Sequence, residues 1–297
     1  MVREKMEQYS GLYTYFGHHK CATQWISAIL KGACDDLGLN FAKAFNQKLK
    51  TSKQDLSAFV KENKIDFLGY TTAAPHYVAQ VDDYKGFHVI RDPRDICVSA
   101  YFSHLHSHPV RDYMPEIAAA RKELKGLSQD EGLLFVIKGR QLQFEIMYDW
   151  DYSRPNILEI KMENLTVNPY QGFLTIFDFL GLLDKTTFSF RRRLFYPVSS
   201  VANSAVVKAR RKVQILPRLR LGGSKISAES LLGQVYKHQF SQKAQGRQPG
   251  EENVHNHYRK GIAGDWVNHF SKEHRAYFKE HYNKVLVKLG YESGSDW

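Results

Sequence analysis

The stretch that decides the fold reads LYTYFGHHKCATQWISAILKGACDDL and occupies residues 12–37. Residues 12–16 are aromatic, β-branched or apolar, which predicts a short buried strand. Apolar side chains then recur at helical spacing, which predicts a helix over 24–37. The loop between them carries Lys20 and Thr23. Such a loop is typical of phosphate sites, because the first N–H groups and the positive end of the helix dipole face it. The alternative is an ordinary strand–helix turn with a surface lysine.

The rest of the chain alternates between strand and helix patterns, without an internal repeat or a linker rich in Pro, Gly or Ser. Alternation of this kind predicts an α/β fold: a single domain, 1–297, with a central parallel sheet flanked by helices. We expect loop and short helix over 103–130, and a basic loop-and-helix excursion over about 185–232. The patterns predict strands over 12–16, 65–70, 87–91 and 156–161. They predict helices over 24–37, 54–62, 131–149, 169–180 and 271–289, and one that begins at Pro93 with Asp92 as its N-cap.

Composition limits the class of protein. The 297 residues are 43% hydrophobic and carry a net charge of +11, so the chain can build a core and is expected to meet an anionic partner. No apolar run reaches the roughly 18 residues of a membrane span, and the first ten residues lack the apolar stretch of a signal peptide. Three cysteines without a C-x-x-C pair predict reduced thiols. We therefore expect a cytoplasmic protein with no membrane partner.

Two later segments extend the pattern of the loop at 17–24. Residues 87–102 read FHVIRDPRDICVSAYF, and residues 258–270 read YRKGIAGDWVNHF. Together with the loop they resemble, in the same order, the three signatures of sulfotransferases that use 3′-phosphoadenosine 5′-phosphosulfate (PAPS). The run GRQPGEE at 246–252 is similar to the stretch before the last signature, so the resemblance extends from about Tyr13 to Leu289. It implies PAPS as co-substrate at the carboxyl ends of the strands. It also implies transfer of the sulfuryl group to a hydroxyl or amine of a small-molecule acceptor, with release of adenosine 3′,5′-bisphosphate (PAP).

The resemblance assigns roles to the loop residues. It implies that Lys20 stabilises the leaving phosphate, and that Thr23 and the backbone N–H groups of 21–24 bind the 5′-phosphate. Trp25 is implied to stack on adenine; the alternative is a buried helix aromatic. A usual glycine is Ala22 here, which fits only if that position does not need a positive φ. A usual threonine is Gln24, which can still donate a hydrogen bond. The implied cofactor-binding residues of the loop are His19, Lys20, Cys21, Ala22, Thr23, Gln24 and Trp25.

The other two signatures imply a 3′-phosphate site. Arg91 and Ser99 are implied to grip the phosphate, for which a guanidinium offers two parallel donors. The residues implied to close over it are Arg259, Lys260 and Gly261. Arg94 and Asp95 read more simply as a surface ion pair. For adenine, Phe240 aligns with an aromatic near the base, and Met162 stands where relatives carry a tyrosine.

The position of the general base does not match the family pattern. Relatives place a histidine in a Lys-Thr-His run, which falls near Thr71; the nearest histidine is His76, five residues later. Histidine suits proton transfer near neutral pH, so we take His76 as a candidate, with a carboxylate elsewhere as the alternative. The alternating run His104, His106 and His108 has strand-like spacing and suits a solvated face or an acceptor pocket better than a metal site. PAPS chemistry implies no metal.

Other classes of function remain open alternatives. A nucleotide-dependent kinase would need a phosphate loop, but no G-x-x-x-x-G-K-[ST] motif is present. A nucleic-acid-binding protein, or a degenerate sulfotransferase that binds nucleotide without turnover, could use the basic tract of the excursion, yet no helix-turn-helix, RNP or zinc-finger pattern accompanies it. We expect no nucleic acid partner. The tract consists of Arg191, Arg192, Arg193, Lys208, Arg210, Arg211, Lys212, Arg218, Arg220 and Lys225.

Assembly is a further expectation from the resemblance. Cytosolic animal relatives dimerise through a short Lys-Thr-Val-Glu-type pattern just after Gly-Asp-Trp. The matching stretch, 267–276, keeps neither the lysine nor the glutamate. The resemblance therefore implies a monomer, or a dimer that does not use this motif.

Overall fold

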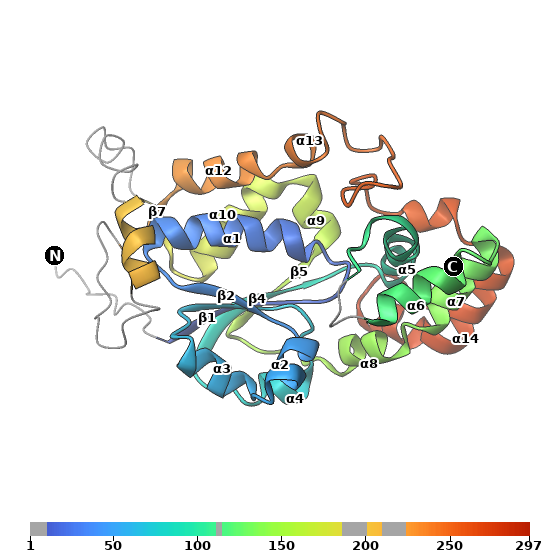
Figure 1. Cartoon of the computed structure of the whole chain (residues 1–297), viewed down its shortest axis with the longest axis horizontal. Coiled ribbons are helices and arrows are strands. Elements are labelled where there is room, and N and C mark those ends of the chain that lie inside the picture. The colour runs from blue at the N-terminus through green and yellow to red at the C-terminus, as the bar shows by residue number, and fades with distance from the viewer. Residues whose placement is uncertain (1–10, 111–114, 186–200, 210–223) are drawn as a thin grey trace.

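Within the described residues of the computed structural model, 11–110, 115–185, 201–209 and 224–297, five parallel strands form one sheet (Figure 1). Their order is β2-β3-β1-β4-β5. Every residue of β1 is buried, as expected of a middle strand covered on both faces. The strands are β1 (Leu12–Gly17), β2 (Phe41–Ala44), β3 (Phe67–Tyr70), β4 (Tyr84–Ile90) and β5 (Ile157–Lys161).

Helices cover both faces of this sheet (Figure 1). Because successive strand side chains point to opposite faces, Tyr13 and Tyr15 of β1 enter the core under α1, whereas Leu12 and Phe16 enter the core on the other face. The α1 face carries α1 (Thr23–Leu37), α9 (Met162–Val167), α10 (Pro169–Phe179) and α12 (Ala228–Lys237). The other face carries α2 (Asn46–Ser52), α3 (Leu56–Glu62) and α4 (Pro75–Val78).

A third group of helices follows β4 and packs around its own core, at the right of Figure 1. At its centre the rings of Phe144 and Phe278, both fully buried, lie 5.7 Å apart. The group consists of α5 (Pro93–Phe102), the π-helical turn η1 (Ser103–Ser107), α6 (Pro115–Leu124), α7 (Gln129–Lys138), α8 (Gln141–Asp149), the 3-10 turn η2 (Asp265–Asn268) and α14 (Lys272–Lys288). Shorter elements are the paired β6 (Leu183–Asp184) and β7 (Ile226–Ser227), α13 (Phe240–Lys243) and a helix over 201–209.

This architecture confirms the predicted α/β fold with a central parallel sheet, and several of its elements differ from those expected. β2, α2, α4 and α9 were not expected, because each is at most seven residues long and carries too little pattern to be detected. The helix expected over 131–149 is two helices, since Gly139 ends α7 and Arg140 is the N-cap of α8. The strand-like reading of His104 and His106 is wrong, because both lie in η1, which continues α5.

Most of the basic excursion over 185–232 lies outside the described residues. This includes the basic residues at 191–193, 210–212, 218 and 220.

In the part of the chain that the structure describes, no helix has the length and apolar character needed to cross a membrane.

The loop between β1 and α1 adopts an unusual backbone. Lys20 and Ala22 both have left-handed conformations, with φ of 68° and 56°. Ala22 is the N-cap of α1. We expected alanine to fit here only if residue 22 did not need a positive φ. Its φ is positive, so Ala22 is strained. A left-handed conformation brings Cβ close to the backbone, at a cost of about 1 kcal/mol.

Replacing Ala22 by glycine should remove this strain. We expect Ala22→Gly to raise the free energy of unfolding by about 0.5–1 kcal/mol, because relief of the strain outweighs the added freedom of glycine in the unfolded chain. Ala119→Gly, at an exposed helical position of α6, should instead lower it by about 1 kcal/mol. Urea denaturation with an unchanged slope measures both. An equal loss in both variants would contradict the strain at Ala22.

Candidate active site

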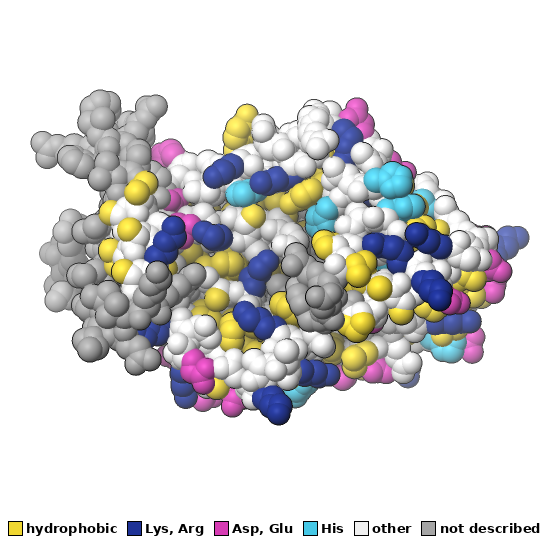
Figure 2. Space-filling model, in the orientation of Figure 1, with side chains coloured by type: hydrophobic (Ala, Val, Ile, Leu, Met, Phe, Trp, Pro, Cys, Tyr) yellow, Lys and Arg dark blue, Asp and Glu magenta, His cyan; other side chains and the backbone are white. Residues whose placement is uncertain are grey.

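The predicted binding residues meet in one place. A cavity of about 260 Å³ lies where β1 and β4 end, and every predicted cofactor-binding residue except Cys21 lines it. The neighbours of β1, which are β3 on one side and β4 on the other, belong to opposite halves of the sheet. Ligands of open parallel sheets bind outside the carboxyl ends at such a switch point. Lysine and arginine side chains are spread over the face shown in Figure 2, with acidic ones mostly toward its edges.

Lys20 is the cation of the β1–α1 loop. Arg91 holds this loop, because its Nη1 donates to the Lys20 carbonyl oxygen at 3.1 Å. Burial, and then the charges of Arg91, Arg140 and Arg259, lower the pKa of Lys20 to about 7. A bound anion would reverse this shift by stabilising the ammonium. The loop is thus preorganised for a strongly anionic ligand.

Cys21 turns away from the cavity. Its side chain is fully buried in the core beside α5, and burial raises the pKa of the thiol to about 12. Its N–H donates to the His18 carbonyl oxygen at 3.1 Å. The thiol therefore does not have the exposed, low-pKa environment of a reactive cysteine, and the residue serves the loop as a packed filler.

The second signature is built around Asp95 of α5. This fully buried carboxylate accepts the N–H of Gly264 at 2.7 Å and of Trp266 at 2.9 Å, and its oxygen lies 3.8 Å from Arg91 Nη2. Arg94 is also buried: its guanidinium lies 3.9 Å from the centre of the Trp266 ring. The reading of Arg94 and Asp95 as a surface ion pair is therefore wrong. Asp95 instead joins the second signature to the third.

In the third signature, the buried carboxylate of Asp265 holds two cationic side chains. Asp265 accepts from Arg259 Nη2 at 2.5 Å and from Lys260 Nζ at 2.6 Å. Burial alone would raise the pKa of Asp265, but hydrogen bonds from His269, Lys260, Asn268 and Arg259 outweigh it and hold that pKa well below its usual range. Glu252, Asp265 and His269 lie close enough for a metal site. A metal would have to displace both cations from Asp265.

Gly261 and three apolar side chains form the remaining wall of the cavity. Gly261 has a φ of 72°, and a Cβ there would lie 2.6 Å from the Phe240 ring, so only glycine fits. Trp25 packs edge-on against Phe173, with ring centres 5.5 Å apart, and also lines the cavity with Met162. Trp25 is thus a half-buried helix aromatic that also lines the cavity, and its stacking on adenine stays a prediction. A wall of this kind suits a flat, apolar base such as adenine.

His76 does not join this site. It is exposed on α4, its ring lies 4.4 Å from that of Tyr77, and it does not line the cavity. The structure therefore removes the geometric basis for His76 as general base. Three other histidines, His19, His108 and His257, do line the cavity. Sequence reasoning missed His257, although it stands only two residues before Arg259.

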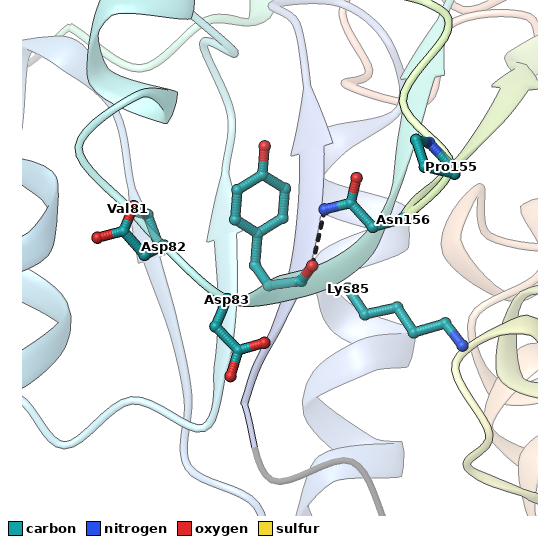
Figure 3. Close-up of a pocket in the computed structure, with 7 residues that line it drawn as sticks. Val81, Asp82, Asp83, Lys85, Pro155 and Asn156 are labelled. Atoms are coloured by element: carbon teal, nitrogen blue, oxygen red, sulfur yellow. Dashed lines mark hydrogen bonds between the residues drawn. The ribbon is translucent and has the colours of Figure 1, made fainter.

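A second, open hollow lies at the opposite, amino ends of β4 and β5 (Figure 3). It is lined by Val81, Asp82, Asp83, Tyr84, Lys85, Pro155 and Asn156, and Asn156 Nδ2 donates to the Tyr84 carbonyl oxygen at 2.8 Å. It shares no residue with the cavity around Lys20. Its residues carry no arrangement of nucleophile, base or anion-binding groups.

Comparison with solved structures identifies the fold of the chain. The chain matches mouse sulfotransferase SULT7A1 complexed with PAP, with a TM-score of 0.52 and 14% identity over 95% of this chain and 86% of that chain. Two structures of retinol dehydratase also match at 14% identity over 92% of this chain. The complex with androsterone and the inactive cofactor PAP has a TM-score of 0.44 over 80% of that chain, and the complex with retinol and PAP has 0.46 over 81%. These two are too distant to add to the fold assignment. No family model and no curated protein sequence matches the chain. The chain therefore has the sulfotransferase fold that the resemblance of its three signatures implies.

Proposed function

We propose that this protein is a sulfotransferase that transfers the sulfuryl group of PAPS to a hydroxyl or amine of a small-molecule acceptor and releases PAP. The observation that carries the proposal is the single cavity in which the three signatures meet. Its cations come from three separate segments of the chain: Lys20 lies in the β1–α1 loop, Arg91 follows β4, and Arg259 and Lys260 belong to the third signature. An apolar wall completes the cavity. Such a site fits a nucleotide with several phosphate groups.

Each group of residues has a separate task in this proposal. PAPS supplies the activated sulfuryl group, whose bond to the 5′-phosphate oxygen breaks as the acceptor oxygen or nitrogen bonds to sulfur. Lys20 stabilises the negative charge that develops on that phosphate oxygen. Thr23, Gln24 and the start of α1 bind the 5′-phosphate. The 3′-phosphate is held by Arg91, Ser99, Arg259, Lys260 and Gly261.

The proton of the acceptor needs a base, and the cavity histidines are the candidates. Partial burial, and then the charges of Lys20 and His108, lower the pKa of His257 to about 4. His257 is therefore neutral at physiological pH and keeps a ring nitrogen lone pair for the acceptor proton, although a pKa this low makes it a weak base. His108 lines the same cavity. We propose that one of these two takes the role first considered for His76.

The kinase alternative is weakened by the composition of the cavity. Among the described residues that line it, none is aspartate or glutamate. Kinases hold their Mg²⁺–nucleotide with carboxylates. Two acids of the signatures, Asp95 and Asp265, are buried and are paired with arginine, lysine or backbone N–H groups. Protection against thermal unfolding by PAP without Mg²⁺, but not by ATP, would separate the two functions.

The activity itself is tested with ³⁵S-labelled PAPS. The assay offers the purified protein a panel of phenols, aliphatic alcohols and amines, and follows transfer of label to the acceptor. Transfer to at least one class supports the proposal and identifies the acceptor chemistry. Binding of PAP with no transfer to any acceptor would favour the non-catalytic alternative.

Lys20 is the first residue to test. Lys20→Ala should reduce kcat by about 10²–10³, as expected when one preorganised charge is removed, while PAP still binds. Lys31→Ala, on the exposed side of α1 where Lys31 pairs with Asp35, is the matched control and should keep its activity. A near-full rate in Lys20→Ala would contradict the assignment.

The lowered pKa of Lys20 makes PAP binding dependent on pH. Free Lys20 loses its proton above about pH 7, and bound phosphate restores it, so binding should take up close to one proton at pH 8 and almost none at pH 6. Calorimetry in buffers of different ionisation enthalpy measures the uptake. Lys20→Arg, which stays charged, supplies the baseline for protons that PAP itself exchanges. Identical uptake in both proteins would show that Lys20 does not titrate on binding.

Arg91 tests the 3′-phosphate site. Arg91→Ala should abolish the preference for PAP over AMP, measured by calorimetry, because the guanidinium is the direct partner of the phosphate that distinguishes them. Arg91 also holds the Lys20 carbonyl, so Ser99→Ala, which leaves that contact intact, is the second variant and should reduce the preference in part. If both variants prefer PAP as strongly as the wild type, the 3′-phosphate lies elsewhere.

A further inference from the structure

His19, directly before Lys20 and in the lining of the same cavity, is held by a residue outside all three signatures. Arg140 Nη1 lies 3.2 Å from His19 Nδ1. A guanidinium has donors only, so Nδ1 must be the acceptor of this hydrogen bond. The ring is therefore neutral and carries its proton on Nε2.

The break between α7 and α8 places Arg140 at this position (Figure 1). Arg140 is the N-cap of α8, and Gln143 lies in the first turn of that helix. Gln143 Oε1 accepts from Arg140 Nη1 at 3.4 Å, and Gln143 Nε2 donates to the His19 carbonyl oxygen at 2.9 Å. The start of α8 thus holds both the ring and the backbone of His19.

Two more histidine rings pack beside the His19 ring. The ring of His104 is stacked on it, with centres 5.6 Å apart and planes 28° apart, and the ring of His108 lies 6.0 Å away. His104 is buried. Its pKa is lowered to about 2 by burial first and then by Arg140 and Lys20, so it adds no charge beside His19. The His19 ring is therefore held in one orientation.

Arg140 has no acidic partner among the described residues. Its Nε is buried without a hydrogen-bond partner. Its main contact is His19, and it does not itself line the cavity. The Nε2 edge of His19, opposite the edge that Arg140 holds, is thus the edge available to the cavity.

We propose that His19 donates its Nε2–H to an oxygen of the phosphosulfate group beside Lys20, and that Arg140 is the positioning residue that fixes this tautomer. This proposal rests on the proposed sulfotransferase function. His19 is then a donor and not the general base, because its proton stays on Nε2 through the transfer. It adds a second electrostatic contribution next to that of Lys20.

The kinetic test uses hydrolysis of ³⁵S-labelled PAPS, which needs no acceptor. We expect His19→Ala to reduce kcat by about 10²-fold, the order for one preorganised donor, with PAP affinity changed less than about threefold. His19→Gln, whose amide can donate from the Nε2 position, should recover most of the rate. Arg140→Ala should reduce kcat similarly, and the double variant His19→Ala/Arg140→Ala should lose no more than His19→Ala alone. A glutamine variant no better than alanine, or additive losses, would overturn the proposal.

A spectroscopic test separates this proposal from the proposed function. In ¹⁵N-histidine-labelled protein, assigned with His19→Gln, His19 should show the neutral Nε2–H form across pH 6–8, and Arg140→Ala should mix the two tautomers. A protonated ring or the Nδ1–H form in the wild type would overturn the assignment even if transfer activity is found. The expected spectra without any PAPS turnover would contradict the sulfotransferase function and leave the Arg140–His19 contact standing.

Discussion

The buried carboxylate of Asp95 connects the second signature, which carries Arg91, to the third signature, which carries Arg259 and Lys260. It lies at the start of α5, near Arg91, and accepts two backbone N–H groups from Gly264 and Trp266. These partners stand about 170 residues later in the chain. Because a buried carboxylate needs its hydrogen-bond donors, the third signature must close on α5 when the protein folds. The cations of the two signatures then face one cavity.

A single charge pattern follows from this closure. Asp95 and Asp265 lie behind Arg91, Arg259 and Lys260, where they are buried and hold these cations in place. None of the described lining residues is acidic. The cationic side chains therefore give the cavity a positive potential. They are already held in place, so an entering anion does not have to reorganise them. Burial, and then this positive charge, lowers the pKa of Lys20. Above about pH 7, binding of an anion must therefore also protonate Lys20, which weakens the observed binding.

Sequence patterns could predict the strand–loop–helix at the N-terminus, the parallel sheet and the residues that gather in the cavity. These features depend on local periodicity and on short motifs. They did not predict β2, whose four residues carry no clear period, or the break at Gly139, because apolar residues recur at helical spacing on both sides of the polar stretch 138–141. Nor could they predict that Asp95 is buried, because its partners at 264 and 266 are distant in the chain. Nor could they predict that His76 lies away from the cavity, because its nearness in sequence to the expected position does not determine where its side chain lies.

The strained backbone of the β1–α1 loop needs several contacts from the rest of the fold to hold it. Lys20 and Ala22 are both left-handed on either side of Cys21, and such conformations persist only where the surroundings fix them. Three contacts do so here. Arg91 holds the Lys20 carbonyl, Gln143 holds the His19 carbonyl, and the buried Cys21 side chain anchors the centre of the loop. Each support comes from a different element, namely the end of β4, the start of α8 and the core beside α5. The conformation that presents Lys20 to the cavity is therefore a property of the whole fold and not of the loop sequence, which is how the loop can carry Ala22 and Gln24 in place of the residues usual in similar loops.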